Sequence, residues 1–205
     1  MKTRVLLIRH GATIVSTQDP FAGSSNVPLS EEGRQQASKL AERLSHGRLD
    51  AVYCSPMDRT IETATIIGAP HDLKPTSIPG VREIDYGNWE GLEKSVVASN
   101  FSGNWAQWQE DPYAVAPAGG ESGVRVLSRA LPALLSIVEE NRGKTVAVIA
   151  HKGTNRLLIS SLLGLDVRRF RDRLDQKPAA LNILDFDLHF KAFLCLFNDT
   201  SHYER

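Results

Sequence analysis

The chain of 205 residues has no excess charge of either sign, only two cysteines and no long hydrophobic run. Its 24 basic and 24 acidic residues cancel, so no overall field attracts nucleic acid or an anionic membrane, and we expect neither partner. The first apolar stretch, residues 5–8, ends at Arg9 and is far shorter than a signal-peptide core, and no later run approaches a membrane span. These absences favour a soluble, cytoplasmic protein.

The scarcity of cysteine excludes a disulfide framework. Cys54 and Cys195 both lie in apolar, strand-like segments, so we expect two buried, inert thiols in a reducing compartment. His46, His71 and His189 show no spacing typical of metal ligands. The sequence therefore predicts no metal site.

Short apolar segments alternate with amphipathic ones along most of the chain. Residues 5–8, 51–54 and 146–150 have the composition of buried parallel strands. Residues 181–187 and 190–197 are typical of a terminal hairpin, which either pairs across a homodimer or completes the sheet. The pattern predicts a three-layer α/β sandwich, with a mostly parallel central sheet, an antiparallel edge near the C-terminus and helices on both faces.

Two helices are indicated between the strands. Ser30 is a suitable N-cap for the first, and a longer apolar face runs through residues 124–138, where we expect Pro132 to kink the helix. The whole chain is interpreted as one domain, 1–205. The segments at about 14–28 and 88–120 are predicted to be lid-like loops or short irregular helices over one end of the sheet, where α/β folds carry their sites.

Candidate phosphate ligands follow each predicted buried strand. Arg9 and His10 follow the first strand, where Gly11 lets the backbone turn tightly, and His151 follows the strand at 146–150. Because the carboxyl ends of parallel strands share one edge of the sheet, we expect these side chains to converge.

The segment "SPMDRTIETA" follows the remaining strand. Ser55 is suited to the N-cap of a helix and Pro56 to its first position, which would place Arg59 in the first turn, facing the same edge. Arginine offers paired donors to phosphoryl oxygens, and a protonated histidine adds a third charged donor. A neutral imidazole can attack phosphorus, and Glu83 in "VREIDYGNWEG" is the best candidate proton donor.

Six segments occur in a recognisable order: "LLIRHGAT", "FAGSSNVPLSEEGRQQA", "SPMDRTIETA", "REIDYGNWEG", "GGES" and "AHKGTNRLL". From residue 4 to about 160 the chain resembles the phosphoglycerate-mutase-like branch of the histidine phosphatase superfamily. The resemblance implies that His10 is the phosphorylated nucleophile and that Glu83 donates a proton and later activates water. It implies further that the phosphoryl oxygens are held by Arg9, Arg59 and His151, and that neither a metal nor another cofactor takes part.

The chain also departs from the family pattern. Ser16 stands where the family usually has an asparagine that helps to bind the phosphoryl group. Lys152 replaces a common glycine, and it either contacts a second anionic group of the substrate or is solvated. Phe21 and Gly23, in the second motif, are further candidates for substrate binding.

Three other features have plainer interpretations. The basic run "VRRFRDRLDQK" alternates with acidic residues and is typical of a solvated helix face. Glu121 in "GGES" is expected to cap the following helix. Trp89, Trp105, Trp108 and Tyr113 either line a substrate lid or pack the loop that contains them.

The resemblance leaves the reaction to be decided. A mutase needs extra cations to hold a sugar-acid carboxylate, but Ile84 and Asp85 offer none, and Lys94 is the only basic residue in the segment 88–120. We therefore expect a phosphatase acting on a small phosphorylated metabolite. The alternatives are a phosphoglycerate mutase and a catalytically silent member that binds phosphorylated ligands or serves as a scaffold, although all five residues implied in catalysis are present.

Overall fold

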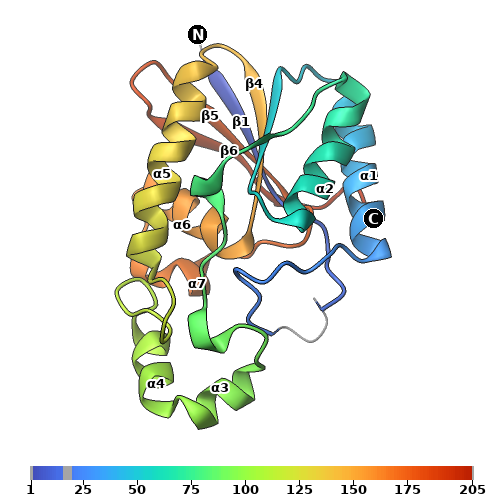
Figure 1. Ribbon diagram of the computed structural model, residues 1–205. Helices are drawn as coiled ribbons and strands as arrows, with labels where there is room; N and C mark the ends of the chain where they lie inside the picture. The colour runs from blue at the N-terminus through green and yellow to red at the C-terminus, as the bar shows by residue number, and fades with distance from the viewer. Residues whose placement is uncertain (1, 16–19, 205) are drawn as a thin grey trace.

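The computed structural model describes residues 2–15 and 20–204, and its six strands form one mixed sheet in the order β3-β2-β4-β1-β5-β6 (Figure 1). The first four strands pair in parallel, and the two C-terminal strands are antiparallel. The strands are β1 (Thr3–Arg9), β2 (Ala51–Cys54), β3 (Thr76–Ser77), β4 (Thr145–Ala150), β5 (Leu181–Phe186) and β6 (Ala192–Asp199). The predicted α/β sheet and its antiparallel edge are confirmed, while the two-residue strand β3 is too short to give a sequence pattern.

Helices cover both faces of the sheet, α1 and α2 on one face and α5 and α6 on the other (Figure 1). The helices are α1 (Glu31–Ser45), α2 (Asp58–Gly68), α3 (Lys94–Asn100), α4 (Ser102–Glu110), α5 (Gly123–Glu140), α6 (Lys152–Leu162) and α7 (Phe170–Arg173). Short 3-10 turns are η1 (Ala69–His71), η2 (Pro79–Val81), η3 (Gly87–Trp89) and η4 (Val167–Arg169). None of these helices is long and apolar enough to cross a lipid bilayer in the part of the chain described.

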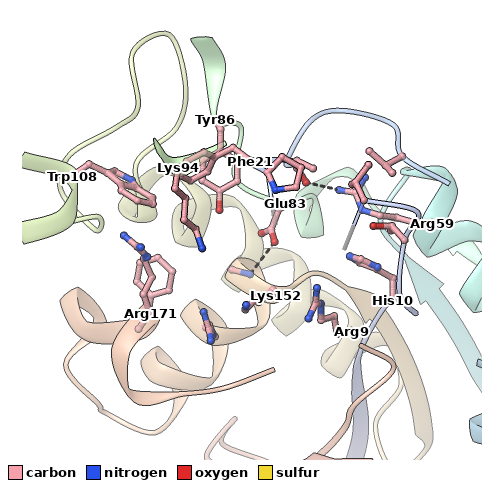
Figure 2. A pocket seen from close by; sticks show the side chains of 18 residues that line it. Arg9, His10, Phe21, Arg59, Glu83, Tyr86, Lys94, Trp108, Lys152 and Arg171 are labelled. Atoms are coloured by element: carbon pink, nitrogen blue, oxygen red, sulfur yellow. Dashed lines mark hydrogen bonds between the residues drawn. The ribbon is translucent and has the colours of Figure 1, made fainter. Parts of the chain in front are cut away.

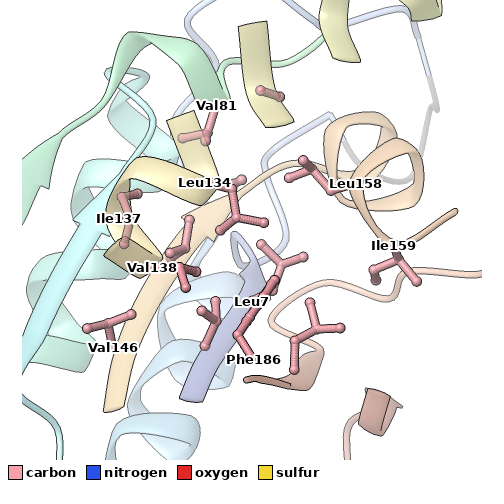
Figure 3. Close-up of a cluster of buried hydrophobic side chains, with 14 residues drawn as sticks. Leu7, Val81, Leu134, Ile137, Val138, Val146, Leu158, Ile159 and Phe186 are labelled. Carbon is pink, nitrogen blue, oxygen red and sulfur yellow. The ribbon is translucent and has the colours of Figure 1, made fainter. Parts of the chain in front are cut away.

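Strand β1 is buried on both faces, which explains its unbroken apolar sequence. Leu7 packs in the cluster that contains Leu134 of α5 (Figure 3). Ile8 belongs to the separate cluster that contains Leu40 of α1. Burying each such side chain contributes about 1.5–3 kcal/mol. This packing on both faces fixes the end of β1, from which the next residues project.

Two helix predictions need correction. The first helix begins as expected, since the Ser30 hydroxyl accepts the Gly33 N–H at 3.1 Å. Helix α2, however, begins at Asp58 rather than at Pro56, and Ser55 does not cap it. In helix α5, Val124 is 42% exposed because the buried face starts instead at Gly123 and Val126. The helix includes Pro132, and the kink expected there stays a prediction.

The prediction for the cysteines is half right. Cys54 is buried in the central sheet, and burial raises the pKa of its thiol to about 11. Cys195 is exposed, because β6 lies at an edge of the sheet.

The segment 88–120 forms a small helical lobe that contains α3 and α4 and projects beyond one end of the sheet (Figure 1). Its core is aromatic and separate from the two clusters on the sheet faces. Phe21 enters this core from the other predicted lid segment, with its ring 4.8 Å from that of Tyr86 and 5.6 Å from that of Trp108. The two lid-like segments are therefore packed against each other.

Candidate active site

The strands β1, β2 and β4 end next to one another, and the residues that follow them are His10, Ser55 and His151. The His10 N–H donates to the carbonyl of Ala150 at 3.1 Å, and the Ser55 N–H donates to that of Ile149 at 3.0 Å. The rings of His10 and His151 are consequently 5.3 Å apart and meet edge to face. The two histidines therefore lie side by side at this edge of the sheet, as the sequence predicts.

His10 is held in one orientation and one tautomer. Its Nδ1 lies 2.7 Å from the carbonyl oxygen of Gly11, an acceptor, so Nδ1 carries the proton and Nε2 keeps its lone pair. The side chain is 6% exposed, and burial, together with Arg9 and Arg59, holds its pKa well below 6.5. His10 therefore has the protonation state of a nucleophile at neutral pH.

Gly11 is required for close packing behind this histidine. A methyl group at Gly11 would lie 2.4 Å from the carbonyl oxygen of Gly33 in α1. The first turn of α1 is thus pressed directly against the backbone that carries His10.

His151 differs from the sequence-based expectation in its charge. Its Nε2 lies 2.8 Å from the Ser55 hydroxyl, and its buried Nδ1 has no hydrogen-bond partner among the described residues. Burial, followed by the charges of Arg59, His10 and Arg9, holds its pKa well below 6.5, so the ring is neutral rather than a charged donor. A bound phosphate dianion would oppose that shift by favouring the protonated ring.

Arg9 and Arg59 are both anchored by backbone carbonyls. Arg9 donates to the carbonyl of Gln176 at 2.7 Å, and burial lowers its pKa to about 10, which leaves it charged at neutral pH. Arg59 is 2% exposed and donates to the carbonyls of Ser25 and Gly23, at 2.7 Å each. Both residues line the cleft, and each guanidinium has more N–H groups than these carbonyls use.

Glu90 fixes the turn to which Arg59 is tied, although no pattern singles it out beyond its place in "NWEG". Its carboxylate accepts the N–H groups of Gly23, Ser24 and Ser25, at distances of 2.9 to 3.2 Å. A side chain from the helical lobe thus organises the segment that positions a phosphate-clamp arginine.

Glu83 lies against the start of α6. Its carboxylate accepts the N–H groups of Gly153 at 2.9 Å and Thr154 at 3.0 Å, as well as the Thr154 hydroxyl and the N–H of Ile84. A methyl group at Gly153 would lie 2.9 Å from Oε1, so a glycine is needed for this approach. The carboxylate is held in place at the wall of the cleft.

Arg129 supports Glu83 from behind. Its guanidinium donates to the carbonyls of Gly80, Arg82 and Glu83 and forms a salt bridge of 2.7 Å with Glu121. Glu121 therefore does not cap α5, as expected from the sequence, but pairs with Arg129 to fix the backbone around the candidate acid.

These residues surround an open cleft of about 200 Å³ (Figure 2). Of the residues predicted from the sequence, the cleft is lined by Arg9, His10, Phe21, Arg59, Glu83 and Lys152. His151 is fully buried, with its ring beside that of His10, and is not among the lining residues. Gly23 is not among the described residues that line this cleft, and its contact with substrate stays a prediction. A methyl group at Gly23 would overlap the carbonyl oxygen of Ile84, so this position requires a glycine. Ser16 lies outside the described residues.

Two cleft residues were missed by the sequence analysis. Arg156, from α6, and Arg171, from α7, both line the cleft, and the Arg171 guanidinium lies 3.8 Å from the centre of the Trp108 ring. Interpreting the basic run as a solvated helix face is therefore wrong for Arg171, which turns inward onto the helical lobe. Trp108 fills both suggested roles, because it packs in the lobe and lines the cleft.

The charge state of the histidines can be measured. We expect the imidazole NMR signals of His10 and His151, assigned with His10→Gln and His151→Gln, to be those of neutral rings at about pH 6. Because the unfolded chain would bind these protons near the ordinary pKa of 6.5, the free energy of unfolding should fall as the pH drops below it. Protonation of both rings at about pH 6 would contradict the structure.

Glu90 provides a test of how the clamp is built. Glu90→Ala leaves several backbone N–H groups without an acceptor, so we expect the free energy of unfolding to fall by about 1–3 kcal/mol and KM for an aryl phosphate to rise. Denaturant unfolding and steady-state kinetics measure the two effects. Glu93→Ala is the matched control, because Glu93 is exposed and its carboxylate does not cap α3; an equal effect there would remove the proposed role.

Comparison with known proteins agrees with this site. The family model of the histidine phosphatase superfamily (branch 1) matches residues 5–199. Phosphoserine phosphatase 1 of Hydrogenobacter thermophilus is 32% identical over 167 residues, covering 82% of this chain and 79% of the relative. The adenosylcobalamin/alpha-ribazole phosphatase of Escherichia coli is 28% identical, covering 84% and 86%.

Solved structures give the same result. Bacillus stearothermophilus YhfR superposes with a TM-score of 0.92 at 28% identity, covering 98% of this chain and all of that one. A mycobacterial glucosyl-3-phosphoglycerate phosphatase in complex with VO3 superposes with a TM-score of 0.85 at 28% identity, covering 95% of this chain and 98% of that one. The chain therefore belongs to branch 1 of the histidine phosphatase superfamily and is a phosphatase.

Proposed function

We propose that this phosphatase hydrolyses small phosphomonoesters through a phosphohistidine formed on His10, without a metal ion. The observation that carries the proposal is the hydrogen bond from His10 Nδ1 to the Gly11 carbonyl, which leaves Nε2 unprotonated in a cleft flanked by Arg9 and Arg59. An imidazole in that state can displace an alcohol from phosphorus, and two guanidinium groups can stabilise the charge on the equatorial oxygens.

The first step forms the bond between Nε2 and phosphorus as the phosphorus–oxygen bond of the ester breaks. The departing oxygen needs a proton, and Glu83, at the wall of the cleft, supplies it. Arg9, Arg59 and His151 hold the phosphoryl oxygens, with the buried Nδ1 of His151 as the donor that has no other described partner.

The second step releases phosphate. The Glu83 carboxylate accepts a proton from water, the water oxygen bonds to phosphorus, and the phosphorus–nitrogen bond to His10 breaks. His10 returns to its neutral form, which is the form favoured by burial and by the two arginines. The glutamate regains the proton that it donated, so the cycle closes without a metal ion.

The relatives suggest which compounds to test first. Their names refer to phosphoserine, alpha-ribazole and glucosyl-3-phosphoglycerate, all of them small metabolites. We infer that the physiological substrate is of this size. The cytoplasmic location and the homodimer remain predictions, and β6 is the strand whose outer edge a second copy could use.

The test is phosphate release by the purified protein in excess chelator, from an aryl phosphate and from these metabolites, beside an assay for interconversion of 2- and 3-phosphoglycerate. We expect release from at least one compound and an acid-labile, alkali-stable phosphate on the protein after rapid denaturation. Interconversion without release would identify a mutase. Activity that stops with chelator would overturn the metal-free mechanism, and no turnover in either assay would favour a silent phospho-ligand-binding member.

A further inference from the structure

Among the described residues, more cations line the cleft than one phosphoryl group requires. Beyond Arg9 and Arg59 it is lined by Lys94, Lys152, Arg156 and Arg171, and the only described carboxylate on its wall is that of Glu83. A phosphomonoester brings about two negative charges, which the first two arginines match. Figure 2 shows Lys94 and Arg171 at the end of the cleft away from His10 and Arg59, with Lys152 between the two ends.

Arg171 is held in a way that leaves its donors available. Its guanidinium stacks over the Trp108 ring at 3.8 Å, and no described carboxylate forms an ion pair with it. Stacking uses the flat face of a guanidinium and leaves the N–H groups in its plane free to bind a planar or tetrahedral anion. Burial lowers the pKa of Arg171, which marks it as a cation without full compensation.

Arg156 is similarly undercompensated. Its side chain is 13% exposed, its buried Nε has no partner among the described residues, and its contact with the half-solvated Asp175 is long, at 3.4 Å. The positive charge of Arg156 also contributes to lowering the pKa of Arg9 and of Arg171. Arg156 is therefore near enough to both Arg9 and Arg171 for its charge to repel theirs.

Building on the proposed function, we propose that the substrate carries a second anionic group, a carboxylate or a second phosphate, bound by Arg156 and Arg171. We call this pair the distal anion subsite. Lys94 and Lys152 line the same cleft and add positive charge around the bound group. The second anion would relieve the repulsion between Arg156 and its neighbours, and binding it away from the reacting phosphorus would orient the ester for attack by His10.

The test compares three probes that differ in the second group: glycerol 3-phosphate, which has none, 3-phosphoglycerate and glycerol 1,3-bisphosphate. The readout is the ratio of kcat/KM for each doubly anionic probe to that for glycerol 3-phosphate, in which a general loss of folded enzyme cancels. We expect a ratio of about 10–100 for the natural protein. The larger of the two ratios distinguishes a carboxylate from a phosphate.

Arg171→Gln and Arg156→Gln should each reduce that ratio about tenfold, whereas Arg171→Lys should keep a larger part of it. Arg169→Gln is the matched control, since Arg169 is 53% exposed and lies outside the cleft. Ratios near one in the natural protein, or ratios that Arg171→Gln and Arg156→Gln leave unchanged, would overturn the subsite while phosphate release still supported the proposed function. Failure to hydrolyse any of these probes or the aryl phosphate would instead refute the proposed function.

Discussion

His10→Gln is expected to lower kcat/KM for every phosphomonoester by about 10⁴-fold or more, because glutamine cannot form the covalent intermediate. The variant should still fold, since the amide can donate to the Gly11 carbonyl in place of Nδ1. It should also still bind phosphate, because Arg9 and Arg59 are anchored independently of the ring, by the carbonyls of Gln176, Ser25 and Gly23. The measurements are steady-state kinetics and binding of inorganic phosphate.

His46→Gln is the control for this result, because His46 is an exposed residue at the end of α1, away from the cleft. It should be as active as the natural protein. If His10→Gln keeps a tenth or more of the activity, a nucleophile other than His10 must operate, and the phosphohistidine is wrong.

Glu83→Gln is expected to lower kcat/KM by an amount that depends on the leaving group of the substrate. For alkyl phosphates kcat/KM should fall by about 10²–10⁴-fold, because the departing alkoxide needs a proton. For 4-nitrophenyl phosphate kcat/KM should fall much less, because nitrophenolate leaves without protonation. Its kcat should nevertheless drop, since the glutamine cannot activate water to break the phosphohistidine.

A burst of nitrophenol followed by slow turnover is therefore the signature to look for in Glu83→Gln. Thermal unfolding of the variant checks that the start of α6, which the carboxylate contacts through Gly153 and Thr154, is intact. Glu110→Gln, at an exposed position in α4, is the control. Equal losses for alkyl and aryl phosphates would show that Glu83 is not the proton donor.

The elements that could be predicted are those with strong local patterns. Residues 5–8 and 146–150 had to be buried strands because they are apolar on both faces, and the parallel sheet then placed His10 beside His151. The start of α2 was wrong because the Ser55 hydroxyl is used by His151 instead of by the helix. The exposure of Cys195 depends on the order of the strands in the sheet, and the local sequence around Cys195 does not indicate that order.

The distal end of the cleft could not be predicted for a similar reason. Arg171 and Trp108 are far apart in the chain, and only the docking of α7 against the helical lobe brings them together. Lys94 is the only basic residue in the segment 88–120, so few cations were expected for a sugar-acid carboxylate. Arg156 and Arg171 were missed because they reach the cleft from α6 and α7.

The separate aromatic core of the helical lobe has a consequence for how this protein can be altered. Phe21 and Tyr86 form its boundary with the rest of the molecule, while the cores on the two faces of the sheet share none of its residues. The lobe can accordingly be exchanged between relatives if Glu90 is kept, because that carboxylate holds the segment to which Arg59 is anchored. Grafting such a lobe onto this sheet would change the walls around the leaving group and leave both the strands that carry the nucleophile and the anchor of Arg59 unchanged, so that substrate preference and chemistry can diverge separately.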